Sequence, residues 1–254
     1  MAGVAGLVLV LHLPVVQRLL SPLLQRAASK ALDKAASKGI GKNIARGLAN
    51  EGVNVILLAS AKDDLERAAE QIHAATGVRV LAVPADMRDT ASVKAAAAAA
   101  ADRFGTVHIL VNNAALTPNR KDDDVRRNRH YTYLTTPVPR QSLEFTSNIT
   151  DDEWHRWWGD NVHGTFSCTR EALKLMQPQK YGRIINIASL SGMSALSAHS
   201  PHYSATKGAV IAFTKSVAAE VAGGNIAVNV VAPGLVHTQE LEAILQKMDE
   251  EARN

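Results

Sequence analysis

Short apolar runs that alternate with helical stretches constrain the fold of this chain more than any other feature. Such alternation implies a parallel sheet covered by helices on both faces. A chain of 254 residues suits one such domain. We therefore expect an α/β protein with a doubly wound parallel sheet, a Rossmann-like three-layer fold in a single domain. The expected strands are 53–59, 78–84, 107–112, 183–188 and 226–231, and the expected helices are 63–72, 89–104, 151–176 and 201–217.

The first 34 residues form an atypical extension. Residues 6–11 are an apolar run, and leucines and alanines then recur at helical spacing. Either residues 6–11 supply the first strand, with an insertion before the next turn, or this strand is absent. We favour the first account, because a parallel sheet without its central strand would lose much of its core.

The apolar start could alternatively be a secretory or anchor segment. Residues 2–16 lack a basic flank and fall short of the roughly 20 residues that span a bilayer. We therefore do not expect membrane association. The segment 116–150, an insert within the domain at 35–254, has mixed charge and no apolar period, which predicts a surface loop. A lid or a partner contact is the alternative for this insert.

Charge and cysteine content exclude several classes of function. The net charge is +4 and the pI about 9.2, but the basic residues are dispersed and form no stripe with aromatics, so we expect no nucleic-acid binding. Cys168, the single cysteine, cannot form an internal disulfide, suits a reducing compartment and is interpreted as a packing residue. We expect a cytoplasmic protein. No group of side chains has metal-ligand spacing, so we expect no metal.

Tyr203 and Lys207 are the strongest candidate for chemistry. Four residues apart in a helix, they share a face and lie about one turn apart. A nearby cation lowers the pKa of a tyrosine from about 10, and such a tyrosine can serve as a general acid or base. Taken alone, however, this spacing is common on solvated helices.

Other motifs lie where strands end or helices begin. Ser189 follows the strand at 183–188, and ligands of open α/β sheets bind beyond the carboxyl ends of strands. Residues 37–41 predict a tight turn that opens a helix. Glycines there let the backbone approach a pyrophosphate, whose charge the helix N-terminus favours.

Together these motifs resemble the short-chain dehydrogenase/reductase family, and within it the 3-oxoacyl-[acyl-carrier-protein] reductases. The matching residues run in family order over about residues 35–238: Ser37, Lys38, Gly39, Ile40, Gly41, Asp86, Met87, Asn112 to Ala115, Asn161, Ser189, Tyr203, Lys207 and 233–238. The resemblance implies an oxidoreductase that interconverts a ketone, such as a 3-oxoacyl group, and a secondary alcohol by hydride transfer.

The resemblance also implies the roles of four catalytic residues. Tyr203 would protonate the carbonyl oxygen, and Ser189 would polarise that carbonyl. Lys207 would lower the pKa of Tyr203 and bind the nicotinamide ribose. Asn161 would hold a proton-relay water, although a buried and satisfied amide is the alternative.

For the cofactor, the resemblance implies that Asp86 holds the adenine amino group; an ordinary loop or helix-cap residue is the alternative. NADP is preferred over NAD, because Ala59 and Ser60 stand where an NAD site places a carboxylate. Lys38, with Lys62 as a second candidate, could neutralise the extra phosphate; the alternative is that both lysines are solvated surface residues. The implied cofactor-binding residues are Ser37, Lys38, Gly39, Ile40, Gly41, Asp86, Met87, Asn113, Tyr203, Lys207, Val236 and Thr238.

The chain departs from the family pattern at both ends. Lys34 and Ala35 replace the usual Thr-Gly, and the sequence stops soon after Thr238, which shortens the segment that covers substrate. These departures motivate a second hypothesis, a catalytically impaired relative that binds a partner. A third, a membrane-associated lipid or sterol reductase, rests only on the apolar start. A small carbonyl or alcohol is the expected partner, and a homo-oligomer is left open.

Aromatic residues near Tyr203 have plainer interpretations. His199 and His202 flank the tyrosine and are interpreted as loop residues, with tuning of the environment of Tyr203 as the alternative. Trp154, Trp157 and Trp158 have near-helical spacing and are interpreted as packing, with a place beside the pocket or an interface as the alternative.

Overall fold

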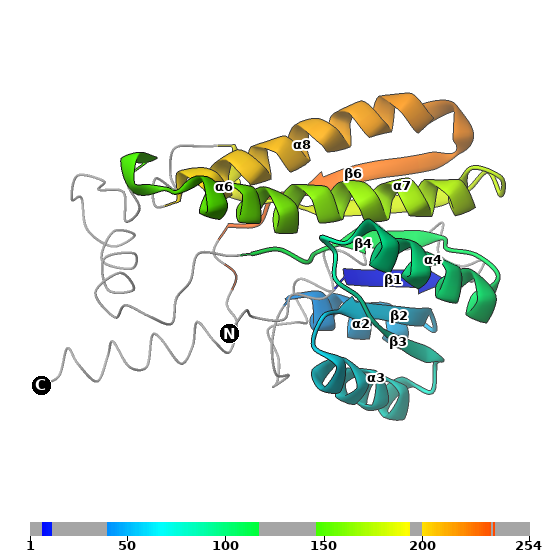
Figure 1. The fold of residues 1–254 in the computed structure, drawn as a ribbon. Helices are drawn as coiled ribbons and strands as arrows, with labels where there is room; N and C mark the ends of the chain where they lie inside the picture. The colour runs from blue at the N-terminus through cyan, green and yellow to red at the C-terminus, as the bar shows by residue number, and fades with distance from the viewer. Residues whose placement is uncertain (1–6, 12–39, 117–145, 194–199, 235, 237–254) are drawn as a thin grey trace, which may run out of the picture.

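The computed structural model describes residues 7–11, 40–116, 146–193, 200–234 and 236 (Figure 1). They contain a six-stranded sheet in the order β3-β2-β1-β4-β5-β6. Helices cover both faces of this sheet, as the alternating sequence pattern predicts. The strands are β1 (Leu7–Leu11), β2 (Asn54–Ala59), β3 (Val80–Pro84), β4 (Ile109–Asn112), β5 (Gly182–Ile187) and β6 (Ile226–Val231).

Two of the helices, α4 and α6, begin at side-chain caps. Asp89 caps α4 by accepting hydrogen bonds from the backbone N–H groups of Ala91 and Ser92. Thr150 and Glu153 form a capping box at the start of α6. The helices are α2 (Ile40–Asn50), α3 (Lys62–Thr76), α4 (Thr90–Phe104), α6 (Asp151–Trp158), the π-helix (Gly159–His163), α7 (Gly164–Met176) and α8 (Pro201–Val221), with 3₁₀ turns η2 (Thr146–Asn148), η4 (Leu190–Gly192) and η6 (Ala222–Gly224).

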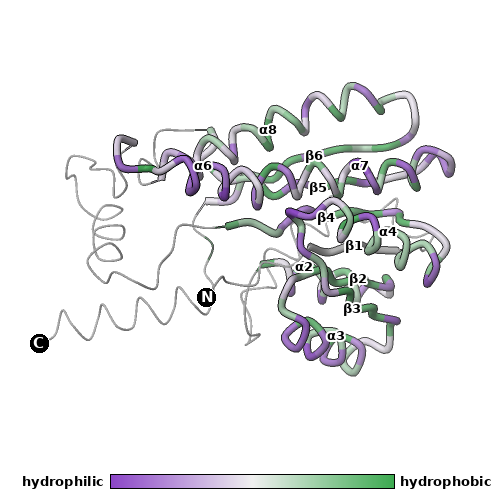
Figure 2. The backbone as a smooth tube through the Cα atoms, viewed as in Figure 1, coloured by the Kyte–Doolittle hydropathy of each residue, from purple (hydrophilic) through white to green (hydrophobic). Residues whose placement is uncertain are grey.

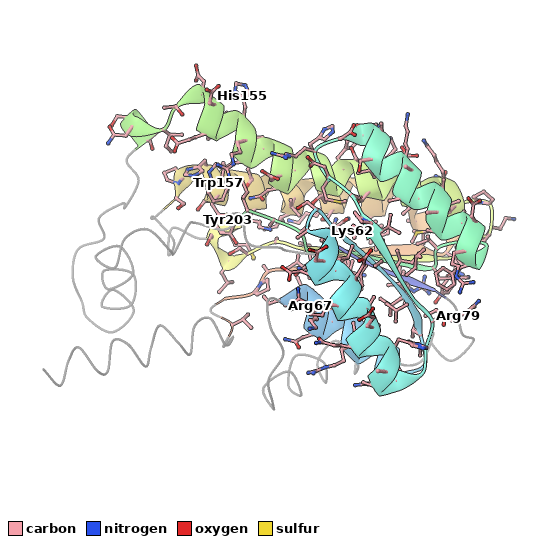
Figure 3. The ribbon with its side chains drawn as sticks, turned by 60° about the horizontal axis from the view of Figure 1, so that its bottom comes forward. Lys62, Arg67, Arg79, His155, Trp157 and Tyr203 are labelled. Carbon is pink, nitrogen blue, oxygen red and sulfur yellow. The ribbon has the colours of Figure 1, made fainter. Side chains whose placement is uncertain are left out.

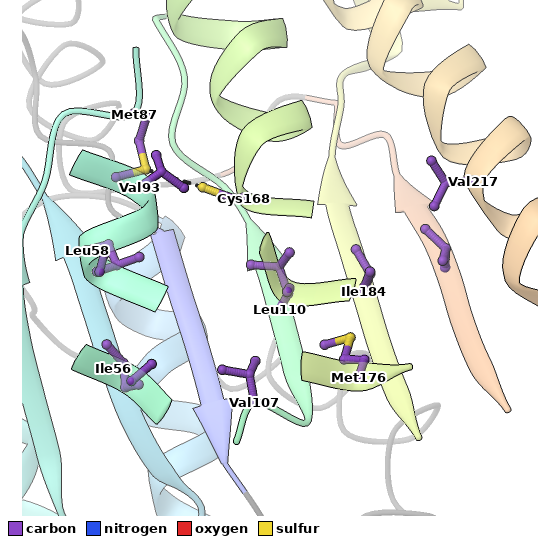
Figure 4. Packing of buried hydrophobic residues seen from close by; sticks show 14 of the residues in the cluster. Ile56, Leu58, Met87, Val93, Val107, Leu110, Cys168, Met176, Ile184 and Val217 are labelled. Carbon is purple, nitrogen blue, oxygen red and sulfur yellow. Dashed lines mark hydrogen bonds between the residues drawn. The ribbon is translucent and has the colours of Figure 1, made fainter. Parts of the chain in front are cut away.

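Successive side chains of a buried strand point to opposite faces of the sheet and pack in two separate cores. In β2, Ile56 and Leu58 pack in the core beneath α4, α7 and α8, while Val55 and Leu57 pack in the core beneath α2 and α3. Figure 1 shows these two groups of helices on opposite sides of β1. Figure 4 shows the first core, where Cys168 and Met87 make a sulfur contact of 3.6 Å.

The hydropathy of the chain follows this three-layer arrangement. Figure 2 shows β6 in green and much of α3 in purple. Cys168 is buried in the first core, which confirms its interpretation as a packing residue. Among the helices that the structure describes, none is both long and apolar enough to cross a bilayer.

The first strand lies at the centre of the sheet but runs against its neighbours. Residues 7–11 form β1 between β2 and β4, as the first account of the N-terminal extension expects. β2–β3, β4–β5 and β5–β6 are parallel pairs, whereas β1 is antiparallel to both β2 and β4. Leu7 therefore lies opposite Leu58, and Leu11 lies opposite Asn54.

The reversed strand changes how the chain reaches α2. A parallel strand would deliver the chain directly to the carboxyl edge, where α2 begins. β1 instead ends at the opposite edge, beside the start of β2. Residues 12–39 separate it from α2, which gives the chain enough length to return; these residues lie outside the described part of the structure, as do 117–145 of the predicted insert.

The expected helix at 151–176 is present, with one change of geometry. It runs as α6, the π-helix and α7 without a break. π-Helical turns inside α-helices occur frequently at functional sites. The carboxyl edge of the sheet and this irregular turn together position the candidate site.

Candidate functional site

Parallel strands bring several of the predicted residues to one edge of the sheet. β3 leads to Asp86, β4 to Asn113 and β5 to Ser189. Because these strands run in the same direction, the three residues emerge at the same carboxyl edge, where open α/β sheets bind ligands. Ile40 and Gly41 open α2, which runs back toward the start of β2 and so also begins at this edge.

Tyr203 and Lys207 lie together on α8, one helical turn apart. The Nζ atom of Lys207 lies 5.8 Å from the centroid of the Tyr203 ring. Tyr203 is half-buried, whereas Lys207 is almost completely buried. The structure thus places a phenol beside an ammonium group, as their spacing predicts.

Lys207 is anchored to the end of β5. Its Nζ donates a 2.9 Å hydrogen bond to the backbone carbonyl of Ile187. Burial lowers the pKa of this ammonium from its ordinary 10.5 to about 8, because a buried charge loses its hydration. The group is therefore still mostly protonated at pH 7, and it can stabilise a nearby phenolate.

Ser189 lies two residues after Ile187, in a turn that packs against α8. Its Oγ accepts a hydrogen bond from the Ser191 backbone N–H and donates one to Ser191 Oγ, both 3.1 Å long. Gly192 closes the same turn. A Cβ there would lie 2.6 Å from the backbone nitrogen of Gly208, so only glycine allows this approach of η4 to α8.

Asn161 lies in the π-helix and ties three segments together. Its Oδ1 accepts a 2.6 Å bond from the Leu116 N–H, and its Nδ2 donates to the Leu116 carbonyl at 3.2 Å and to Thr206 Oγ1 at 3.1 Å. The side chain is buried. This geometry matches the alternative interpretation, a buried and satisfied amide; a role in holding a relay water stays a prediction.

A buried polar network lies beneath these residues, and the sequence analysis did not identify it. Asn112 Nδ2 donates to Asn186 Oδ1 at 2.7 Å and to Thr169 Oγ1 at 3.1 Å. Asn186 Nδ2 donates to Thr214 Oγ1 at 2.9 Å, which links β4, β5, α7 and α8. A lone amide such as Asn186 in an apolar strand was the signal that could have revealed it.

The carboxylate of Asp86, predicted to hold adenine, is paired with Arg88. Arg88 Nη2 donates to Asp86 Oδ2 at 2.7 Å, and its Nε donates to Oδ1 at 3.0 Å. These hydrogen bonds lower the pKa of Asp86. The same Nε lies 3.8 Å from Oδ1 of Asp160, whose carboxyl has its pKa raised chiefly by burial. Arg88 thus connects the end of β3 to the π-helix that carries Asn161.

The remaining predicted cofactor residues have varied surroundings. Met87 is buried in the core beneath α4 and α7, Asn113 is half-buried, and Val236 is exposed. Ser37, Lys38, Gly39 and Thr238 lie outside the described residues.

At the end of β2, no acidic side chain occupies the two positions where an NAD site would place a carboxylate. Ala59 is buried and Ser60 is exposed. Lys62 is exposed at the start of α3, with its Nζ 3.8 Å from a carboxylate oxygen of Glu66. A solvated ion pair of this kind adds little stability, so Lys62 could exchange partners readily.

Aromatic side chains surround the start of α8. His202 is buried in the first turn of that helix, so its interpretation as a loop residue is wrong; His199 lies outside the described residues. Trp157 of α6 contacts the rings of both His202 and Tyr203. Figure 3 shows the labelled Trp157 and Tyr203 close together at one end of the molecule.

The described residues fit a nicotinamide dinucleotide. Lys207 has three N–H donors and gives one to Ile187, which leaves donors for hydroxyl groups of a ribose. The first turn of α2, with its buried Gly41, offers backbone N–H groups that suit a pyrophosphate. In the part of the chain that the structure describes, no group of three or more histidine, cysteine or acidic side chains could hold a metal ion.

Comparisons with known proteins agree with this geometry. The family model described as short chain dehydrogenase matches residues 31–249. The 3-oxoacyl-[acyl-carrier-protein] reductase FabG of Staphylococcus aureus is 33% identical over 205 residues, which cover 80% of this chain and 73% of that protein. The 2-(R)-hydroxypropyl-CoM dehydrogenase of Xanthobacter autotrophicus is 35% identical over 187 residues, 74% of this chain and 66% of the relative.

Solved structures show the same likeness. The L-sorbose reductase of Gluconobacter frateurii, complexed with NADPH and L-sorbose, has a TM-score of 0.69 and 30% identity, over 84% of this chain and 71% of that one. A 3-oxoacyl-[acyl-carrier protein] reductase from Brucella melitensis with bound NAD has a TM-score of 0.67 and 27% identity, over 82% and 71% of the two chains.

Proposed function

This chain belongs to the short-chain dehydrogenase/reductase family, and from that premise we propose that it is an NADP-dependent reductase of a ketone. The oxidoreductase class follows from the family, whose members similar to this chain include reductases and dehydrogenases. The finer assignment to a 3-oxoacyl or similar carbonyl rests on the names of these relatives and on the residues at the carboxyl edge.

One observation carries the proposal: the buried ammonium of Lys207 beside the Tyr203 ring. A lysine is almost never buried unless its charge has a use or a partner. Here its one described hydrogen bond goes to a neutral carbonyl, at Ile187. The positive charge stabilises a phenolate at Tyr203, which an acid–base catalyst requires.

The side chains at this edge supply the proton and the polarising contacts. The nicotinamide, when bound, supplies the hydride. Tyr203 donates its hydroxyl proton to the carbonyl oxygen, and the resulting phenolate is stabilised by Lys207. Ser189, whose hydroxyl can rotate away from Ser191, donates a hydrogen bond to the same oxygen as negative charge develops.

In this proposal, Asn161 fixes the relative positions of the segments that form the site. Its amide fastens Leu116, which follows β4, to Thr206, the neighbour of Lys207 on α8. Thr206 Oγ1 in turn donates to the Tyr203 carbonyl at 2.8 Å. A relay water beside Asn161 remains part of the proposal.

The preference for NADP is supported by the charge at the end of β2. Ala59 and Ser60 place no carboxylate where one would repel the 2′-phosphate. Lys62 lies nearby on an exposed first turn and can turn from Glu66 toward a phosphate.

Titration of the purified protein with NADPH and NADH, followed by cofactor fluorescence, tests the proposal. We expect saturable binding with a lower dissociation constant for NADPH, and NADPH oxidation with at least one member of a panel of simple ketones, keto-sugars and 3-oxoacyl thioesters. Binding of NADH in preference to NADPH would refute the cofactor assignment. Binding without any turnover across the panel would refute the reductase assignment.

A second candidate function, a non-catalytic binding protein of the same family, is favoured by the direction of β1. Because β1 ends at the opposite edge of the sheet, α2 does not follow directly from its carboxyl end, and the proposed pyrophosphate site lies at the start of α2. Absence of NADPH and NADH binding even at millimolar concentration would select this candidate.

A further inference from the structure

The first turn of α8 carries Tyr203, and its N-cap residue, Ser200, adds no side-chain cap. The first N–H groups of a helix lack intrahelical partners, and helix ends fray. A proton donor in this position needs to be held by another element, because its hydroxyl must meet the substrate within a fraction of an ångström.

Trp157, on α6, contacts this first turn of α8. Its indole is 9% exposed and meets the His202 ring edge-to-face, with centroids 4.3 Å apart and an interplanar angle of 80°. It also meets the Tyr203 ring, with centroids 5.8 Å apart at 70°. His202 is 3% exposed and Tyr203 is half-buried, and the three rings form one cluster across two helices. Edge-to-face pairs of this geometry are attractive and directional.

We propose that Trp157 is a positioning residue, which fixes the first turn of α8 and so orients the Tyr203 hydroxyl toward the carboxyl edge of the sheet. This inference rests on the proposed function for the role of Tyr203. Among the described contacts of the Tyr203 ring, the charged group is Lys207, on the same helix. By packing on the half-buried ring, the indole also reduces the exposure of the phenol to water, which disfavours the phenolate and opposes the effect of Lys207.

Trp154 provides a matched control on the same helix. It is 38% exposed, and its described ring contact is with Trp158, at 5.9 Å and 47°. The experiment compares Trp157→Leu and Trp157→Phe with Trp154→Leu and Trp154→Phe. Three quantities are measured in each variant: kcat, the dissociation constant of NADPH and the titration midpoint of Tyr203. The midpoint is taken from tyrosinate absorbance, as the difference from the same chain carrying Tyr203→Phe.

We expect Trp157→Leu to lower kcat by about 10- to 100-fold, with the dissociation constant of NADPH changed less than about twofold. The Tyr203 midpoint falls, because water reaches the phenol. Trp157→Phe keeps an aromatic ring and restores most of the turnover, and the Trp154 variants behave as wild type. If Trp157→Leu does not fold, Trp157→Phe is expected to show a smaller fall of the midpoint in the same direction.

A folded Trp157→Leu with the kcat and midpoint of wild type would overturn the proposal, as would equal losses in the Trp154 variants. The absorbance titration needs no turnover, so it separates the two claims. A chain without reductase activity whose Tyr203 midpoint still falls in Trp157→Leu refutes the proposed function and leaves the positioning role intact.

Discussion

Lys207 shows how one residue links the stability of this protein to its chemistry. Burial lowers its pKa to about 8, so the folded state at neutral pH holds a charge that the unfolded chain would solvate better. In the proposed mechanism this charge serves the neighbouring phenol. Replacing this lysine should therefore stabilise the fold while removing the chemistry.

The lowered pKa of Lys207 determines how the free energy of unfolding changes with pH. Between pH 8 and 10.5 the unfolded chain binds more protons at this position than the folded one, so rising pH stabilises the wild type. Relative to Lys207→Met, the free energy of unfolding of the wild type should rise across this window by up to about 3 kcal/mol. Urea denaturation of both proteins at steps from pH 7 to pH 10 measures the difference, and a constant difference would contradict the assignment.

The sequence predicted the Tyr203–Lys207 contact because both residues lie on one helix and helical geometry fixes their relation. It could not predict the partners of Asn161. Leu116 follows a strand far earlier in the chain, and Thr206 lies on another helix, so their meeting depends on the assembled fold. The contact between Trp157 and Tyr203 escaped prediction for the same reason.

At the scale of elements, the site depends on the close packing of η4 on α8. Gly192→Ala would place a Cβ 2.6 Å from backbone atoms of Lys207 and Gly208, which cannot move without displacing α8. We expect a destabilisation of about 1 to 3 kcal/mol and a loss of kcat, since Ser189 and Tyr203 move apart.

Gly223→Ala is the control for this prediction. A Cβ at Gly223 meets nothing within 4 Å, so this variant should keep the melting temperature of the wild type. Thermal unfolding and kcat of the two variants are compared. A Gly192→Ala protein as stable and active as Gly223→Ala would show that the packing of this turn is dispensable.

Helices and strands of the parallel halves were predictable because their apolar periodicity is regular. The π-helix at 159–163 was not, since one extra residue in a helical turn leaves no local mark in the sequence. The buried Asn161 in this turn is explained by its hydrogen bonds to Leu116 and Thr206.

For the whole molecule, the direction of β1 is the feature that sequence could not supply. An apolar run at 6–11 fits a buried strand in either direction, and only pairing with β2 and β4 decides between them. An antiparallel central strand joins two parallel halves of the sheet, β3–β2 and β4–β5–β6, into one layer.

Pairs of engineered cysteines test whether β1 runs antiparallel to β2. Leu7 lies opposite Leu58 in the antiparallel register, where paired Cα atoms are close enough for a disulfide. Leu7→Cys with Leu58→Cys should therefore cross-link on oxidation, and Leu11→Cys with Leu58→Cys should not. The native Cys168 can stay, because burial raises its pKa to about 12 and keeps the thiol unreactive. Cross-linking of the second pair alone would mean that β1 runs parallel.

The most direct test of the whole account is the turnover of Tyr203→Phe with NADPH and an active carbonyl substrate, measured beside its NADPH dissociation constant. The account predicts that turnover is abolished, because the proton donor is gone, while NADPH binding stays close to that of the wild type. Turnover retained by Tyr203→Phe would contradict it.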